Sequence, residues 1–270
     1  AGRRLPQLAR LHGWGFVVDV QAVREVGLGA EQEDDDDDED EEEYAPLGGV
    51  GLRSCIQGEG DPPDELLLAA VACAASGKVR GVPVQRLRED DAIDELDLND
   101  ADIGDTGVTL LGLMLPPAMS LRSLNVDGCA LQIGELKGTK PTEKIDLSGK
   151  RLGVNSAIII ASCIKDNGLL KELNLRDNEL GPKGAAALAE GLKGNSTLQS
   201  LDLFDNKIGD KGASALAAIL KETQITNLNL RYNSLGPEGV AALVEGLKGN
   251  TTLQSLDLQY NNLNDEAKQA

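Results

Sequence analysis

The feature that most constrains the fold of this chain is a stretch of sequence that recurs nearly unchanged. Leu170–Asn195 reads LKELNLRDNELGPKGAAALAEGLKGN, and Ile225–Asn250 reads ITNLNLRYNSLGPEGVAALVEGLKGN. Both stretches share an L-x-L core whose first residue recurs at Leu96, Leu124, Ile145, Leu173, Leu201, Leu228 and Leu256. The steps between these positions are 28, 21, 28, 28, 27 and 28 residues. Such a period predicts a solenoid in which each unit packs against its neighbours.

Each period reads as a short strand followed by a turn and an amphipathic helix. The three clearest helices are expected over residues 182–193, 210–221 and 237–248. Pro182 and Pro237 suit the first turn of a helix, and Gly194 and Gly249 suit the turn after its end. We therefore expect an α/β solenoid of about seven repeats of 28 residues. Its parallel strands lie on the concave face, and the wider helices take the convex face.

The sequence before the repeats has a different character. A strand is expected at the end of GWGFVVDV (Gly13–Val20), and Glu33–Glu43 is an unbroken run of acids. A helix that caps the array is expected from Asp61, with prolines in its first turn, to Gly77. The predicted organisation is an N-terminal arm (1–30), an acidic tract and Gly-rich linker (31–60), a cap helix and lead-in (61–90), and the solenoid (91–270).

The charge of the chain bears on its partners. The formal net charge is −19, and the acidic run carries much of it. An acidic body lacks the clustered Lys and Arg that phosphate binding needs, so no nucleic-acid partner is predicted. The acidic run has three interpretations: a solvated spacer, a segment that docks on a basic protein surface, or a weak binder of cations.

Cysteine usage and hydropathy bear on the compartment. The four cysteines show no C-x-x-C pairing, which favours a reduced, intracellular and cytoplasmic location. The longest strongly apolar run, Leu66–Ala75, is too short to insert into a bilayer. The chain does not begin with Met, so we expect a processed form or a fragment. Arg3–Arg10 is either the remnant of an organelle-targeting segment or a plain basic terminus.

The residues give no pattern for catalysis, for a cofactor or for a metal. His12 is the single histidine, so no histidine triad or histidine metal site is predicted. The acidic segment near Asp97 fails as a calcium loop, because Asp102 stands where the loop needs Gly and Val108 where it needs Glu. We therefore predict a protein that is not an enzyme and binds no cofactor.

The repeat unit L-x-x-L-x-L-x-x-N-x-L-G-x-x-G-A-x-A-L-A-x-x-L resembles the ribonuclease-inhibitor class of leucine-rich repeats. The same class occurs in NOD-like receptors and in the Ran GTPase-activating protein. The resemblance covers residues 91–270. It implies that the Asn side chain of each unit bonds backbone groups of the turn and forms a ladder along the array. These ladder residues are Asn178, Asn206, Asn233 and Asn261.

The first three units depart from this pattern. Ala101, Cys129 and Lys150 stand at the Asn position, and Cys is the familiar substitute among them. The second unit has no recognisable helix, so local distortion is expected near residues 131–145. At the other end, an exposed apolar edge is expected, which either a further piece of chain or a partner covers. Its residues are Leu253, Leu256, Leu258 and Leu263.

Two columns of side chains point away from the predicted core. The first alternates Asp and Asn: Asp97, Asn125, Asp146, Asn174, Asp202, Asn229 and Asp257. It is either a set of short polar side chains that bond to neighbours or an acidic ladder for a ligand. The second column gathers aromatic residues and arginines, the types enriched in interface hot spots. Its predicted partner-binding residues are Arg176, Phe204, Arg231, Tyr232 and Tyr260, although these rings alternatively only pack against adjacent repeats.

The function expected from these features is noncatalytic protein–protein interaction. The chain would be a module or scaffold subunit that binds protein partners through the concave face and the edges of the arc, within a larger complex. One alternative is a regulator of a small GTPase that resembles the Ran GTPase-activating protein. In that family the acidic segment follows the repeats, whereas here it precedes them. The other alternative is a purely structural subunit of a large assembly.

Overall fold

The computed structural model describes residues 10–13, 16–19, 56–57, 82–89, 93–99, 104–115 and 120–263. The chain divides into two compact units. The first comprises Ala1–Ile93 and Ala101–Ser120, and the second comprises Asp94–Asp100 and Leu121–Ala270. In the described part of the chain, no helix is long and apolar enough to cross a membrane.

The described residues of the first unit form a small antiparallel sheet and two helices. The sheet has the order β1 (Arg10–Gly13), β2 (Phe16–Asp19) and β3 (Ile56–Gln57). Strand β2 confirms the strand predicted at the end of GWGFVVDV. Helices α4 (Val84–Glu89) and α5 (Gly104–Met114) contact each other. The predicted cap helix and the acidic tract lie outside the described residues.

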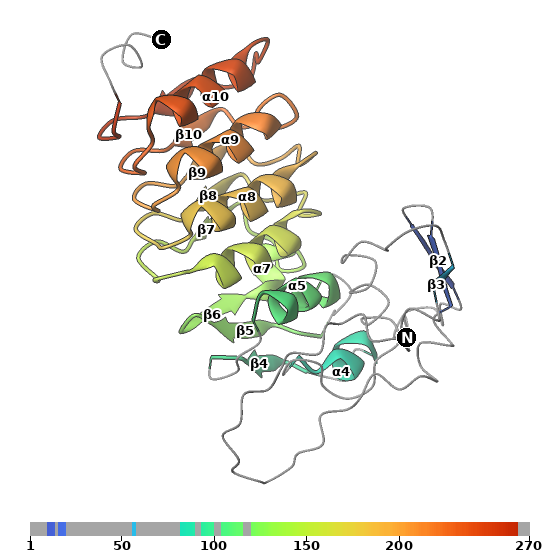
Figure 1. Ribbon diagram of the computed structural model, residues 1–270. Helices are drawn as coiled ribbons and strands as arrows, with labels where there is room; N and C mark the ends of the chain where they lie inside the picture. Colours follow the sequence, from blue (N-terminus) through green and yellow to red (C-terminus); the bar gives the residue numbers. More distant parts are fainter. Residues whose placement is uncertain are drawn as a thin grey trace, which may run out of the picture. The chain divides into compact units, whose positions relative to one another are not determined.

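The second unit contains five parallel strands in chain order (Figure 1). They are β7 (Lys144–Asp146), β8 (Glu172–Asn174), β9 (Ser200–Asp202), β10 (Asn227–Asn229) and β11 (Ser255–Asp257). The register pairs Ile145 with Leu173, and each later strand repeats the match. The apolar residues that the period singled out therefore stack as one ladder.

Four helices lie side by side against one face of this sheet (Figure 1). They are α7 (Val154–Ile164), α8 (Gly181–Leu192), α9 (Gly209–Ile219) and α10 (Pro237–Leu247). The bounds of α8, α9 and α10 agree closely with the three helices that the sequence predicts. Leu188 and Leu216 on these helices, like Leu173 and Leu201 on the strands, are at most 1% exposed. Aliphatic burial of this kind is the main stabilising contribution to the array.

The parallel stack that the sequence predicts is interrupted after its second strand. Strands β4 (Glu95–Asp97) and β5 (Ser123–Val126) pair in parallel, but β5 then pairs antiparallel with β6 (Cys129–Gln132). The one-turn helix α6 (Ile133–Leu136) follows. The distortion expected near residues 131–145 is thus confirmed, and it takes the form of a hairpin. Cys129 does not stand in for the ladder Asn, because it lies in β6 opposite Val126.

The asparagine ladder forms as the resemblance implies at Asn178, Asn233 and Asn261, whereas the Oδ1 of Asn206 has no hydrogen-bond partner among the described residues. The Asn178 amide donates to the carbonyl oxygens of Leu147 and Leu175, both at 2.9 Å, and its Oδ1 accepts the N–H groups of Lys150 and Leu152 at 3.0 Å. Asn233 and Asn261 make equivalent bonds to backbone groups. Each side chain therefore ties its own turn to that of the preceding repeat.

A second set of asparagines occupies the turns between the helices and the strands, and the sequence analysis did not single it out. Asn167, Asn195 and Asn250 each accept two backbone N–H groups of the turn that follows them. Their amides donate to carbonyl oxygens of the preceding repeat. The turns after α7, α8 and α10 are thus tied to the preceding unit, whereas Thr223 takes the equivalent position after α9.

Candidate functional site

The alternating Asp and Asn column has a structural role. The Oδ1 atoms of Asp146, Asn174, Asp202, Asn229 and Asp257 each accept the backbone N–H two residues later, at 2.9–3.1 Å. This local turn suits Asp and Asn equally, because both carry an acceptor at the same place. The column is therefore a set of short polar side chains that make structural hydrogen bonds. Each bond goes to the backbone of the same repeat rather than to a side chain of a neighbouring repeat.

The hydrogen bonds of such a turn affect the pKa of the Asp146 carboxylate. It accepts the Ser148 hydroxyl at 2.7 Å and the Ser148 N–H at 3.0 Å, and these hydrogen bonds hold the pKa of Asp146 below its usual value. Among the described residues, no cluster of His, Cys, Asp and Glu is arranged to hold a metal ion.

The side chains that follow this column form one continuous cluster, which we call the aromatic–arginine patch. It comprises the five predicted residues Arg176, Phe204, Arg231, Tyr232 and Tyr260. The Phe204 and Tyr232 ring centroids lie 5.3 Å apart with an edge-to-face geometry. The Tyr232 and Tyr260 rings stack at 4.6 Å with an interplanar angle of 4°. The aromatic rings of three successive repeats are thus in contact.

The two arginines bind to the faces of these rings. The guanidinium carbon of Arg176 lies 4.3 Å from the Phe204 centroid, and that of Arg231 lies 4.4 Å from the Tyr260 centroid and 5.5 Å from the Tyr232 centroid. Cation–π contacts at these distances contribute about 0.5–1 kcal/mol each at exposed sites. The stack therefore holds its own side chains in fixed positions before any partner arrives.

The patch remains open to solvent despite this packing. Tyr232 is 43% exposed and Tyr260 is 62% exposed. The Nε atom of Arg231 is buried and has no hydrogen-bond partner among the residues that the structure describes. The Oδ1 of Asn206 and the Oγ1 of Thr223 share this feature, so it does not distinguish the patch from the rest of the array.

The backbone at both tyrosines is also unusual. Tyr232 has φ 58° and Tyr260 has φ 56°, both in the left-handed region. The same position in earlier repeats holds Gly149, Asp177 and Asp205, residues that adopt this conformation more readily. A bulky residue with positive φ costs about 1–2 kcal/mol. Backbone preference therefore does not account for tyrosine at these positions.

The described cysteines do not supply a nucleophile. Cys129 and Cys163 are both free and buried. Burial raises the pKa of Cys163 to about 12 and raises the pKa of Cys129 to a smaller extent. Because the thiolate is the reactive form, both thiols are inert at neutral pH.

Comparisons with known proteins agree with this geometry. The family model described as "Leucine Rich repeat" matches residues 93–112, 164–189, 194–217, 223–244 and 249–267. No curated protein matches the chain.

Several solved structures resemble it, including the following two. The first, leiomodin-1 actin-binding site 2, is 22% identical with a TM-score of 0.46, and the match covers 51% of this chain and 81% of that one. The second, the tropomodulin C-terminal domain of Caenorhabditis elegans, is 16% identical with a TM-score of 0.34, covering 62% and 89%. At these values neither likeness identifies a partner.

Proposed function

The chain is a leucine-rich repeat protein, and from that premise we propose that it is a noncatalytic module that binds a protein partner through the aromatic–arginine patch. The later repeats give a rigid scaffold, because Asn178, Asn233 and Asn261 tie their turns to those of the preceding repeats. A rigid scaffold that presents preorganised side chains loses little conformational entropy on binding.

The observation that carries the proposal is the pair of exposed tyrosines in left-handed conformation. Tyr232 and Tyr260 replace the glycine or aspartate of other repeats, remain open to solvent and stack on each other. Arg231 packs against both rings. Interface hot spots are enriched in Tyr and Arg, and rigid aromatic anchors at their centres contribute most of the binding energy.

The test replaces patch residues and compares binding with stability. We expect Tyr232→Ala and Arg231→Ala each to weaken the capture of the binding partner by at least about tenfold, the size of a hot-spot loss. Binding is measured by affinity purification with quantitative mass spectrometry. The free energy of unfolding should fall by less than about 1.5 kcal/mol, since an aromatic pair contributes no more than that.

The control is Tyr232→Phe, which keeps the ring and should retain binding. If Tyr232→Ala and Arg231→Ala captured every partner as well as the unchanged chain does, the patch would be structural and the proposal would be wrong.

A further inference from the structure

Because the sheet is interrupted, β6 and β7 each have one edge that pairs with no other strand among the described residues. Strand β6 ends one sheet and β7 begins the next, and the two strands do not pair with each other. The cause is the short second period, in which Leu124 and Ile145 are 21 residues apart rather than 27 or 28. That length accommodates the hairpin and the one-turn helix α6, and β6 takes the place beside β5 that the next parallel strand would occupy.

The register of β6 shows which backbone groups are free. In a two-residue hairpin, residue pairs that are hydrogen-bonded to each other alternate with pairs that are not. The pair that flanks the turn is a hydrogen-bonded one. Here that pair is Val126 and Cys129. The alternation makes Arg122 and Ile133 another hydrogen-bonded pair, and the Ile133 N–H indeed donates to the Arg122 carbonyl oxygen at 2.8 Å. The N–H and C=O groups of Ala130 and Gln132, which lie between the bonded pairs, therefore point away from β5.

The register of β7 gives the matching edge. The N–H groups of Leu147 and Gly149 donate to carbonyl oxygens in the neighbouring repeat, so the alternate residues Lys144 and Asp146 turn their backbone groups to the other side. The Thr142 hydroxyl bonds both backbone groups of Lys144. It donates to the Lys144 carbonyl oxygen at 2.8 Å and accepts the Lys144 N–H at 3.4 Å. The edge groups of Asp146 have no such partner in the described part of the chain.

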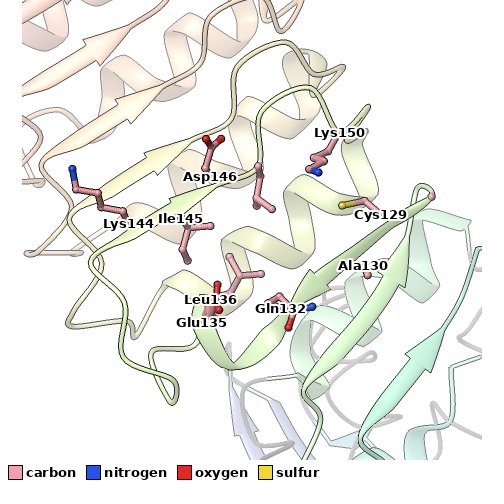
Figure 2. Close-up of a pocket in the computed structure, with 11 residues that line it drawn as sticks. Cys129, Ala130, Gln132, Glu135, Leu136, Lys144, Ile145, Asp146 and Lys150 are labelled. Carbon is pink, nitrogen blue, oxygen red and sulfur yellow. The ribbon is translucent and has the colours of Figure 1, made fainter.

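A pocket of about 450 Å³ lies at these edges, and Figure 2 shows most of the side chains that line it. It includes Ala130 and Gln132 from β6, Leu136 from α6, and Ile145 and Leu147 from β7 and its end. Its volume is within the range of about 300–1,000 Å³ that is typical of ligand sites.

The floor of the pocket exposes part of the core. Leu147 is only half-buried, whereas its equivalents Leu175, Leu203 and Leu230 are 0% exposed. The same intermediate burial recurs at Leu258, on the last described strand. Leu147 in the interior of the array thus has the same intermediate burial as Leu258 at its end. The reason is that Leu147 lacks the neighbouring strand that covers the equivalent leucines of other repeats.

Among the described residues that line the pocket, Lys150 is the cation that forms no ion pair. Lys144 points away from the other labelled side chains in Figure 2 and pairs with Glu172 at 2.8 Å. Glu135 pairs with Lys140 at 2.6 Å. Lys150 forms no ion pair with any residue that the structure describes, although it lies near enough to Asp146 to lower its pKa. In an acidic protein, such an ammonium group is available to an anionic ligand.

We propose that this break in the sheet binds an extended segment of a partner protein, which adds as a strand between β6 and β7. Its backbone pairs with the free groups of Ala130, Gln132 and Asp146, in the manner of β-strand addition. An apolar side chain of the segment covers Leu147, and a carboxylate of the segment pairs with Lys150. This site is separate in sequence and in residues from the aromatic–arginine patch, and the inference does not depend on the function proposed for that patch.

The test starts with a random peptide library displayed against the full chain. We expect the enriched peptides to alternate apolar and polar residues and to include an acidic one. Binding of the synthetic peptides is then measured by fluorescence polarisation. The key variant is Gln132→Pro, which removes one N–H from the edge without straining the backbone, since Gln132 has φ −82°.

We expect Gln132→Pro to weaken binding by at least about tenfold, and the matched variant Gln132→Ala to leave it unchanged, because only proline lacks the N–H. Lys150→Ala should weaken binding and Lys150→Arg should retain it. N-methylation of alternate peptide nitrogens should weaken binding in both phases of the alternation, because the N–H groups of one phase face β6 and those of the other phase face β7.

Two results would overturn the inference. One is a library that yields no peptide whose binding depends on Gln132→Pro. The other is a set of peptides that bind as tightly after N-methylation, in either phase, as before it. Peptides that are insensitive to Gln132→Pro but lost on Tyr232→Ala would overturn the strand-addition site and support the patch, so failure of one proposal is distinguishable from failure of the other.

Discussion

Replacement of Asn233 by alanine is expected to lower the free energy of unfolding by about 3 kcal/mol. The Asn233 side chain is fully buried. Its amide donates to the carbonyl oxygens of Leu203 and Arg231 at 2.7 and 3.2 Å, and its Oδ1 accepts the N–H groups of Asn206 and Ile208 at 3.0 and 3.3 Å. Alanine leaves these groups buried without partners, and each buried polar group left unpaired costs about 1–3 kcal/mol.

The measurement is urea unfolding followed by circular dichroism, with Asn229→Ala as the matched control. Asn229 is half-buried and accepts one backbone N–H, that of Arg231, at 3.1 Å. Its loss should therefore lower the free energy of unfolding by about 1 kcal/mol or less. Equal losses for the two variants would show that the ladder is no more important than a local turn.

The second large effect is expected from Gly191→Ala. Gly191 lies in α8 where this helix crosses the backbone of α7. A Cβ atom there would fall on the carbonyl oxygen of Ala161 and within 2.7 Å of its carbonyl carbon. Backbone atoms cannot rotate away, so the two helices must separate. We expect a loss of about 3 kcal/mol in the free energy of unfolding, despite the better helix propensity of alanine.

The control for this prediction is Gly168→Ala, because a Cβ at Gly168 would meet nothing within 4 Å. Its effect should be below about 1 kcal/mol in either direction. Gly246→Ala should repeat the large loss, since its Cβ would fall on the backbone of Ala217. A Gly191→Ala variant as stable as the unchanged chain would contradict the close packing of α7 against α8.

The regular repeats could be predicted from the sequence because their signals are local and periodic. The L-x-L cores occur at a nearly constant spacing, so each strand and helix is specified by the same few residues. The asparagine ladder followed in the same way from the position of Asn178 and its equivalents. Glycines such as Gly191 give no such signal, since their role depends on how closely two helices approach.

The hairpin in the second period was not predicted, although its signal is present. Asp127–Gly128 is a favoured pair for the turn of a two-residue hairpin, and both residues have positive φ, 52° and 73°. The search for a repeating unit assigned these residues to a solenoid turn instead. The pocket between β6 and β7 could not be predicted from the sequence either. It exists only because β5 pairs with β6 rather than with the strand of the following repeat.

The membership of the patch could be predicted, but its geometry could not. Equivalent residues of successive repeats lie side by side, so the spacing alone placed Phe204 near Tyr232 and Tyr260. The stacking of Arg231 on the rings depends on rotamers that the sequence does not specify. The positive φ of Tyr232 and Tyr260 was likewise not predicted. Asp177 and Asp205 at the equivalent positions were a signal for it, because aspartate adopts positive φ more readily than most residues.

The most direct test of the central claim is a photo-crosslinking measurement at the patch. A benzoylphenylalanine residue replaces Tyr260 in one variant and Val244, which is 37% exposed on α10, in the other. The account predicts that light produces a covalent adduct with a discrete partner protein from the Tyr260 position and none from Val244. It also predicts that Arg231→Ala suppresses that adduct. Equal crosslinking from both positions, or an adduct from Val244 alone, would contradict the assignment of partner binding to the patch.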